Sequence, residues 1–308
     1  MSLLLVAQHR DMKPFRDAIL EKDSNMDVEI WPEVQDPRRV QFAVAWNQPK
    51  NLFGQYPNLK AISSLGAGVD HLLADSSIPD PIRITRFVAP SLSDQMSDYV
   101  LTAVLNLLRN TEEYYRQQKQ SEWKAVPFFS KNDLAAGVMG LGELGRDTAE
   151  RLQMNGFKVN GWSKSKKEID DVVSYSENEL NEFLSATNIL VCMLPLTNET
   201  EGILDLKLFK MMKQPAFLIN VARGEHLVEE DLIYALDTGL ITRAVLDVFS
   251  KEPLPDSHPF WSREKITITP HIASLTNPKE VAELLVENYK RLLSGMDLLY
   301  EIDREKGY

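Results

Sequence analysis

Short apolar runs alternate with amphipathic stretches along the whole chain. The runs predict strands at Leu3–Ala7, Phe42–Trp46, Ala61–Leu65, Ala135–Met139, Lys158–Trp162, Ile189–Met193, Ala216–Asn220, Ala244–Val248 and Ile266–Thr269. Segments with helical spacing lie between them, such as Leu144–Asn155, Glu229–Leu236 and Pro278–Leu293. Runs that are apolar on both faces and separated by helices are typical of a parallel sheet covered on each side. The pattern therefore predicts an α/β fold.

One segment departs from this alternation. From residue 91 to residue 120 the helical pattern continues for longer than a crossover between two strands needs, with Val100, Val104 and Leu107 on one face. We place a domain boundary within this segment, near residue 100, and expect a second parallel sheet after it. The chain of 308 residues has room for two domains of about 150 residues each.

Composition and charge exclude several classes of protein. The chain carries 34 Lys and Arg against 45 Asp and Glu, and its net charge of −11 argues against nucleic acid or an acidic membrane as a partner. Cys192 is the single cysteine, so no internal disulfide can form and a reducing compartment is indicated. No apolar stretch has the length of a membrane helix or the form of a signal peptide, so we expect a cytoplasmic protein.

A glycine-rich turn provides the first functional motif. Gly140, Gly142 and Gly145 have the spacing G-x-G-x-x-G, follow a predicted strand and open an amphipathic helix. In that context the glycines permit a tight turn and a close approach of pyrophosphate, and the helix N-terminus offers N–H groups to the phosphates. We predict a dinucleotide site at these glycines with Glu143 and Leu144. The alternative is a glycine-rich turn that binds nothing.

The next predicted strand indicates which dinucleotide is preferred. An acidic residue about 20 residues beyond the glycines binds the ribose of NAD, but this chain has Ser163, Lys164, Ser165 and Lys166 at that place. Hydroxyl and ammonium groups suit the 2′-phosphate of NADP, which a carboxylate would repel. We therefore predict NADP(H) as the preferred cofactor, with NAD(H) possible. The alternative is a solvated loop whose lysines offset nearby acids.

Five motifs in a fixed order resemble the D-isomer-specific 2-hydroxyacid dehydrogenases. They are Gly66-Ala-Gly-Val-Asp70, the glycine-rich turn, Val221-Ala-Arg-Gly224, Asp247 with Glu252-Pro-Leu254, and Thr269-Pro-His-Ile-Ala273. The resemblance runs over nearly the whole chain, and the segments around Lys164 and Glu252 are similar to the branch that reduces glyoxylate and hydroxypyruvate. It implies two doubly wound parallel-sheet domains with a cleft between them. The substrate-binding, flavodoxin-like domain would comprise residues 1–100 and 275–308, and the Rossmann-type dinucleotide domain residues 101–274.

The resemblance also implies a reaction, the NADPH-dependent reduction of small 2-oxoacids such as glyoxylate and hydroxypyruvate. Arg223 can pair with the substrate carboxylate and polarise the carbonyl group. His271 is suited to act as general acid in reduction and as base in oxidation, and Glu252 can fix its tautomer. Taken singly, these residues could equally be a surface arginine, a core histidine and a carboxylate in a turn. Together, after three successive strands, they favour catalysis.

Further site residues follow from the same resemblance. Backbone N–H groups of Ala67, Gly68 and Val69 could bind the substrate carboxylate, with Trp46 as a pocket wall. The remaining residues implied for the cofactor are Pro195, Thr200, Val221, Ala222 and, for the nicotinamide carboxamide, Asp247. The segment from the long helix through Trp123, Phe128 and Phe129 resembles the arm by which family members dimerise, so a homodimer is expected.

Several alternatives stay open from the sequence. Another specificity within the family, for D-lactate, phosphoglycerate or phosphite, is one. A non-catalytic scaffold that senses dinucleotides is another. His9, His71, His226 and His258 lack a comparable setting and are expected to be structural or surface residues. No pair of histidines has the spacing of metal ligands, so no metal is expected.

Overall fold

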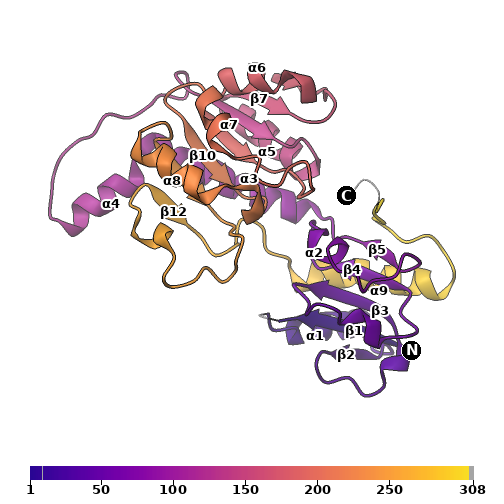
Figure 1. The fold of residues 1–308 in the computed structure, drawn as a ribbon. Helices are drawn as coiled ribbons and strands as arrows, with labels where there is room; N and C mark the ends of the chain where they lie inside the picture. Colours follow the sequence, from indigo (N-terminus) through magenta and orange to yellow (C-terminus); the bar gives the residue numbers. More distant parts are fainter. Residues whose placement is uncertain (9, 305–308) are drawn as a thin grey trace. The chain divides into compact units, whose positions relative to one another are not determined.

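The structure is a computed structural model that describes residues 1–8 and 10–304. The chain divides into two compact units, one formed by Met1–Pro90 with Leu275–Tyr308 and the other by Ser91–Ser274 (Figure 1). Each unit contains one parallel sheet with helices packed on it, which confirms the predicted α/β fold with two doubly wound sheets.

The first unit has a five-stranded parallel sheet in the order β2-β1-β3-β4-β5. Its strands are β1 (Ser2–Ala7), β2 (Val28–Ile30), β3 (Val40–Trp46), β4 (Ala61–Ser64) and β5 (Arg83–Thr85). Its helical segments are α1 (Lys13–Lys22), η1 (Pro37–Arg39), η2 (Phe53–Gln55), α2 (Asp70–Leu73) and α9 (Pro278–Leu293). The strand order is that of flavodoxin-like folds, in which ligands bind at the carboxyl ends of the strands. Helix α9, from the end of the chain, packs beside α1.

The second unit has a seven-stranded parallel sheet in the order β12-β11-β10-β9-β6-β7-β8. Its strands are β6 (Ala135–Met139), β7 (Lys158–Trp162), β8 (Val172–Tyr175), β9 (Ile189–Cys192), β10 (Phe217–Asn220), β11 (Arg243–Leu246) and β12 (Ile266–Ile268). Its helical segments are α3 (Pro90–Arg109), α4 (Thr111–Lys119), α5 (Glu143–Met154), η3 (Glu177–Glu179), α6 (Leu180–Ser185), α7 (Leu206–Met211), η4 (Gly224–His226), α8 (Glu229–Asp237) and η5 (Pro259–Ser262). The order reverses at β6, the strand that leads into the glycine-rich turn, as in dinucleotide-binding folds.

Two apolar layers cover the faces of this sheet. Along β9, Ile189 and Val191 belong to the layer that contains α3 and α5, whereas Leu190 and Cys192 belong to the layer that contains α6, α7 and α8. All four side chains are buried, because successive side chains of a strand point to opposite faces and both faces are covered. This double burial explains why the strands read as continuous apolar runs.

The helical segment predicted over residues 91–120 forms two helices, α3 and α4, separated at Asn110, which has a φ of +53°, and residues 91–120 belong to the second unit. Met96, Val100 and Leu107 of α3 are buried in the same layer as α5, so the division falls at Pro90, where the helix begins, and not near residue 100. Strands β2, β5 and β8 were not predicted, because they are short edge strands interrupted by polar residues. Over the residues the structure describes, no helix has the length and apolar character needed to span a membrane.

A buried amide joins the central strands of the second unit, and we predict its contribution to stability. Fully buried Asn188 accepts from Ala135 N–H and donates to the carbonyl groups of Lys213 and Pro215. Asn188→Leu should lower the free energy of unfolding by about 3 kcal/mol or more, since each unsatisfied buried group costs about 1–3 kcal/mol. Urea unfolding measures the change. The exposed Asn178→Leu is the control, and equal stability of the two variants would contradict the prediction.

Candidate active site

The glycine-rich turn between β6 and α5 has the steric form of a phosphate-binding turn. Gly140 has a φ of +110°, and a Cβ there would lie 2.7 Å from the Met193 carbonyl oxygen. A Cβ at Gly145 would lie 1.8 Å from the carbonyl oxygen of Gly140. A Cβ at Gly142 would meet nothing within 4 Å, and no side chain caps the helix that starts at Glu143. Two glycines thus shape the turn, while the third leaves its backbone open to a phosphate, as a dinucleotide requires.

The loop after β7 presents two ammonium groups at the edge of the sheet that also carries the glycine-rich turn. Lys164 and Lys166 keep 71% and 58% of their side chains exposed. Lys166 forms a 2.8 Å ion pair with Glu179, which, with the bonds from Ser176, lowers the pKa of that glutamate to about 2. The Ser163 hydroxyl donates to the Ser165 carbonyl group and shapes the loop. The loop suits the 2′-phosphate of NADP, which could replace Glu179 as the acceptor.

The loops that follow β9, β10, β11 and β12 lie along one edge of the sheet, because parallel strands end on the same side. They carry the residues predicted for catalysis and for the nicotinamide end of the cofactor. In the loop after β9, the Thr200 hydroxyl donates to the Pro195 carbonyl oxygen. After β10, Val221 and Ala222 are buried directly before Arg223. The order of the sheet therefore brings these distant segments into neighbouring positions.

Asp247, at the end of β11, holds the loop that follows β12. Its side chain is 1% exposed, and its carboxylate accepts from Ile272 N–H at 2.9 Å, Ala273 N–H at 2.8 Å and the Thr269 hydroxyl at 2.5 Å. Burial raises the pKa of Asp247, although these donors and the charge of His271 act in the opposite direction. The loop that carries His271 therefore donates three hydrogen bonds to one buried carboxylate, and the charge of His271 adds a fourth interaction. Contact with a nicotinamide carboxamide remains a prediction for Asp247.

His271 has a backbone conformation that this loop imposes. Its φ is +54°, in the left-handed region, where a residue other than glycine costs about 1–3 kcal/mol and persists only when its surroundings hold it. The N–H of His271 donates to the Asp247 carbonyl oxygen at 2.8 Å, and the next two N–H groups donate to the Asp247 carboxylate. Asp247 thus stabilises the turn that presents the histidine.

The imidazole of His271 pairs with Glu252, as predicted for an acid–base couple. Nδ1 lies 2.8 Å from Glu252 Oε2, and Phe249 N–H donates to Oε1 at 3.0 Å. Burial alone would raise the pKa of Glu252, but the bond from His271, the charges of His271 and Arg223, and the bond from Phe249 together lower it. An ionised Glu252 accepts the Nδ1 proton, so Nε2 is the nitrogen directed away from the carboxylate.

Arg223 follows β10, and a histidine that we expected to be structural or on the surface lies beneath it. His226 is fully buried, with Nε2 3.3 Å from the Pro195 carbonyl oxygen and Nδ1 3.2 Å from Arg223 N. Nδ1 also lies 3.2 Å from the Arg223 carbonyl oxygen, so in either tautomer one ring nitrogen faces Pro195 and the other faces the backbone of Arg223. His226 therefore ties two site loops together. Its position three residues after Arg223 was the available signal.

In the first unit, the turn Gly66–Val69 follows β4 beside the end of β3. A Cβ on Gly66 would lie 2.9 Å from the ring of Trp46, so only glycine allows this packing. The Ser64 hydroxyl donates to the Gly68 carbonyl oxygen at 2.6 Å and stabilises the turn. Within the described residues, the N–H groups of residues 67–69 have no protein acceptor. Adjacent N–H groups of this kind can bind a carboxylate.

Comparison with known proteins identifies the family. Residues 101–273 match the model of the D-isomer specific 2-hydroxyacid dehydrogenase NAD-binding domain. The chain belongs to this family. Glyoxylate/hydroxypyruvate reductase A of Photorhabdus laumondii is 38% identical to it over 96% of this chain and 98% of that protein. The reductase of the same name from Serratia proteamaculans is 38% identical over 89% of each chain.

Solved structures agree with this membership. A D-isomer specific 2-hydroxyacid dehydrogenase from Xanthobacter autotrophicus, in complex with NADPH and MES, aligns with a TM-score of 0.92 and 35% identity, covering 100% of this chain and 99% of that one. An NADPH-dependent glyoxylate/hydroxypyruvate reductase from Sinorhizobium meliloti, in complex with NADP and sulfate, aligns with a TM-score of 0.93 and 33% identity, covering 100% of both chains. The predicted family and branch are confirmed.

The lowered pKa of Glu252 predicts a pH-dependent contribution to stability. A carboxylate with a lowered pKa in the folded state stabilises the fold above its ordinary pKa of 4.5, and this stability is lost as the pH falls through the folded value. The difference in free energy of unfolding between the native protein and Glu252→Gln should be largest near neutral pH and shrink below pH 4.5. Urea unfolding across pH measures it, with exposed Glu182→Gln as control. A difference independent of pH would contradict the prediction.

Proposed function

We propose that this protein reduces small 2-oxoacids, with glyoxylate and hydroxypyruvate as the leading substrates and NADPH as the preferred cofactor. The observation that carries the proposal is the 2.8 Å pair between His271 and Glu252. It lies at the same sheet edge as the glycine-rich turn and Arg223, whose charge lowers the pKa of Glu252. The names of the reductases from Photorhabdus and Serratia support the same substrates.

The chain's own residues supply the groups that such a reduction needs. NADPH, when bound, supplies the hydride that reduces the carbonyl carbon. Arg223 pairs with the substrate carboxylate and polarises the carbonyl group, because a guanidinium forms two parallel hydrogen bonds with a carboxylate. His271 donates the Nε2 proton to the carbonyl oxygen, so the product gains one hydride and one proton. Glu252 keeps the Nδ1 proton in place and stabilises the imidazolium before transfer.

The remaining predicted site residues have supporting parts in this proposal. The N–H groups of Ala67, Gly68 and Val69 bind the substrate carboxylate, and Trp46, packed on Gly66, forms a pocket wall. For the cofactor, the glycine-rich turn binds the pyrophosphate, and Lys164 and Lys166 bind the 2′-phosphate. The residues proposed beside the nicotinamide are Pro195, Thr200, Val221, Ala222 and Asp247.

The assignment of His271 gives a direct kinetic prediction. His271→Ala should lower kcat/KM for glyoxylate by about 10²–10⁴-fold, the usual contribution of a positioned acid, while dinucleotide affinity changes little. Steady-state assays with a panel of 2-oxoacids and fluorescence titration with NADPH measure the two quantities. Retained turnover would exclude His271 as the acid. Native protein that binds NADPH but reduces none of the 2-oxoacids would favour a dinucleotide-sensing scaffold.

The lysines after β7 predict the cofactor preference. The native protein should show a higher kcat/KM with NADPH than with NADH. The double variant Lys164→Ala, Lys166→Ala should lower the ratio of these values by about 10–100-fold, since each charge-assisted hydrogen bond to phosphate contributes about 1.5 kcal/mol or more. The matched control is the double variant Lys207→Ala, Lys210→Ala, in which both lysines are exposed and lie on α7. A native preference for NADH, or an unchanged ratio in the double variant, would contradict the proposal.

We also propose that the protein forms a homodimer through the arm formed by α4 and residues 120–134. Trp123 is fully exposed, and Tyr115 and Phe128 keep more than half of their surface exposed. Residues 122–130 lack regular structure (Figure 1). Large aromatic side chains gathered on one extended segment are typical of an interface.

The arm predicts a change of oligomeric state. The double variant Trp123→Ala, Phe128→Ala should sediment as a monomer at concentrations where the native protein sediments as a dimer, because it removes the aromatic contacts. Sedimentation velocity distinguishes the two masses. Tyr234→Ala is the control, since Tyr234 is an exposed aromatic residue that lies on α8 and not on the arm. A monomeric native protein would overturn the proposal.

A further inference from the structure

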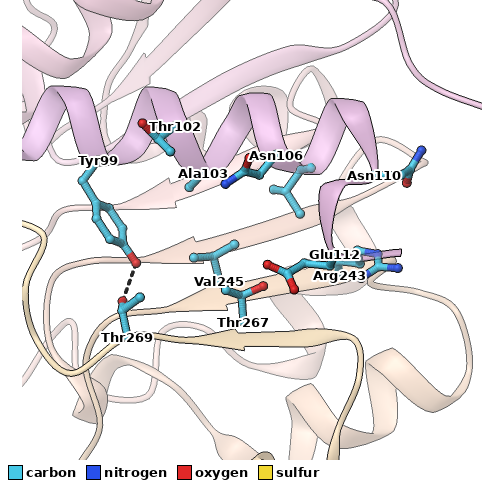
Figure 2. Close-up of a pocket in the computed structure, with 11 residues that line it drawn as sticks. Tyr99, Thr102, Ala103, Asn106, Asn110, Glu112, Arg243, Val245, Thr267 and Thr269 are labelled. Carbon is cyan, nitrogen blue, oxygen red and sulfur yellow. Dashed lines mark hydrogen bonds between the residues drawn. The ribbon is translucent and has the colours of Figure 1, made fainter. Parts of the chain in front are cut away.

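A cavity of about 170 Å³ lies between α3 and the strands β11 and β12 (Figure 2). Its floor is apolar and includes Ala103, Leu107 and Val245. At one end, Tyr99 extends from α3 toward Thr269, just beyond β12, and their hydroxyl oxygens are 2.5 Å apart. Neither residue was among the predicted site residues. The cavity wall is thus continuous with the loop that carries His271.

Two hydrogen bonds along this wall, Tyr99 to Thr269 and Thr269 to Asp247, both donate toward Asp247. Thr269 lies 2.5 Å from the Asp247 carboxylate, which only accepts when ionised, so the Thr269 proton points to Asp247. The Thr269 oxygen must then accept the proton of Tyr99. Burial first, and the charge of Asp247, raise the pKa of Tyr99 to about 12, so its hydroxyl keeps its proton at neutral pH. The chain therefore runs from Tyr99 through Thr269 to Asp247.

We propose that Tyr99 and Thr269 are positioning residues for the reaction, whose hydroxyl groups hold the Asp247 carboxylate in the arrangement that fixes the backbone of His271. This inference rests on the proposed function of His271. The two hydroxyl groups lie on the cavity side of Asp247, and the N–H groups of Ile272 and Ala273 complete its acceptors. Tyr99 and Thr269 act through Asp247.

Loss of the Thr269 hydroxyl should change the pKa of Asp247 in one direction, upward. Within the described residues, two titratable groups interact electrostatically with Asp247. They are Tyr99, on α3, and His271, in the loop after β12. Burial raises the pKa of Asp247, and the Thr269 hydroxyl is the first of the donors that oppose this effect. Without that donor Asp247 should take up a proton at higher pH. A protonated carboxyl group accepts the loop's N–H groups less well, so the acid side of the activity profile should move upward.

The test is the pH dependence of kcat/KM for glyoxylate with NADPH. Thr269→Val should raise the midpoint of the acid limb by about 0.5–1 pH unit, the equivalent of one hydrogen bond. Tyr99→Phe should raise it by less, because it acts one bond further away. Thr269→Ser, which restores the hydroxyl, should return the midpoint to the native value. Thr267→Val is the matched control, since Thr267 lines the same cavity and its hydroxyl bonds to no described residue.

A native midpoint in Thr269→Val, or an equal shift in Thr267→Val, would overturn the proposal. Amide hydrogen exchange of residues 271–273, whose N–H groups bond to Asp247, provides a measurement that needs no turnover. Thr269→Val should exchange faster there than Thr267→Val and the native protein, with the difference growing as the pH is lowered. If the native protein reduces no 2-oxoacid, the proposed function fails, whereas unchanged exchange in Thr269→Val refutes the positioning pair separately.

Discussion

The buried carboxylate of Asp247 is the interaction on which the arrangement of the candidate active site depends. It lies where β11 ends and binds the backbone of the loop that follows β12. That loop holds His271 at a φ of +54°, a conformation that costs free energy and needs such support. A buried charge is itself costly unless it is hydrogen-bonded, and the loop supplies the donors. The carboxylate and the loop therefore stabilise each other.

The parallel sheet explains how residues far apart in sequence form one site. Arg223, Asp247 and His271 each follow a different strand, and these strands are neighbours in the order β10-β11-β12. Because parallel strands share a carboxyl edge, each loop begins about 5 Å from the next. Two hydrogen-bonded side chains then hold these loops in place. His226 joins Arg223 to Pro195, and Thr269 joins Asp247 to Tyr99. The strands bring the loops together, and these hydrogen bonds orient them.

The central strands and the glycine-rich turn could be predicted from sequence, because continuous apolar runs and short motifs depend on local spacing. The Glu252–His271 pair was implied by the resemblance to the family, because the two residues are 19 positions apart and no local pattern joins them. The boundary near residue 100 could not, since the burial of α3 against one sheet depends on long-range packing. Strands β2, β5 and β8 lie at sheet edges, where mixed polar sequences are tolerated. Tyr99 was missed for another reason. Its importance comes from its bond to Thr269, 170 residues along the chain, which no local pattern records.

Asp247 organises the loop that carries His271, and the variant Asp247→Asn tests this role most directly. The amide keeps the shape of the side chain but removes its charge and one acceptor. We expect kcat/KM for glyoxylate with NADPH to fall by about 100-fold, because a small displacement of a catalytic group has an effect of that size. A native kcat/KM in this variant would contradict the account.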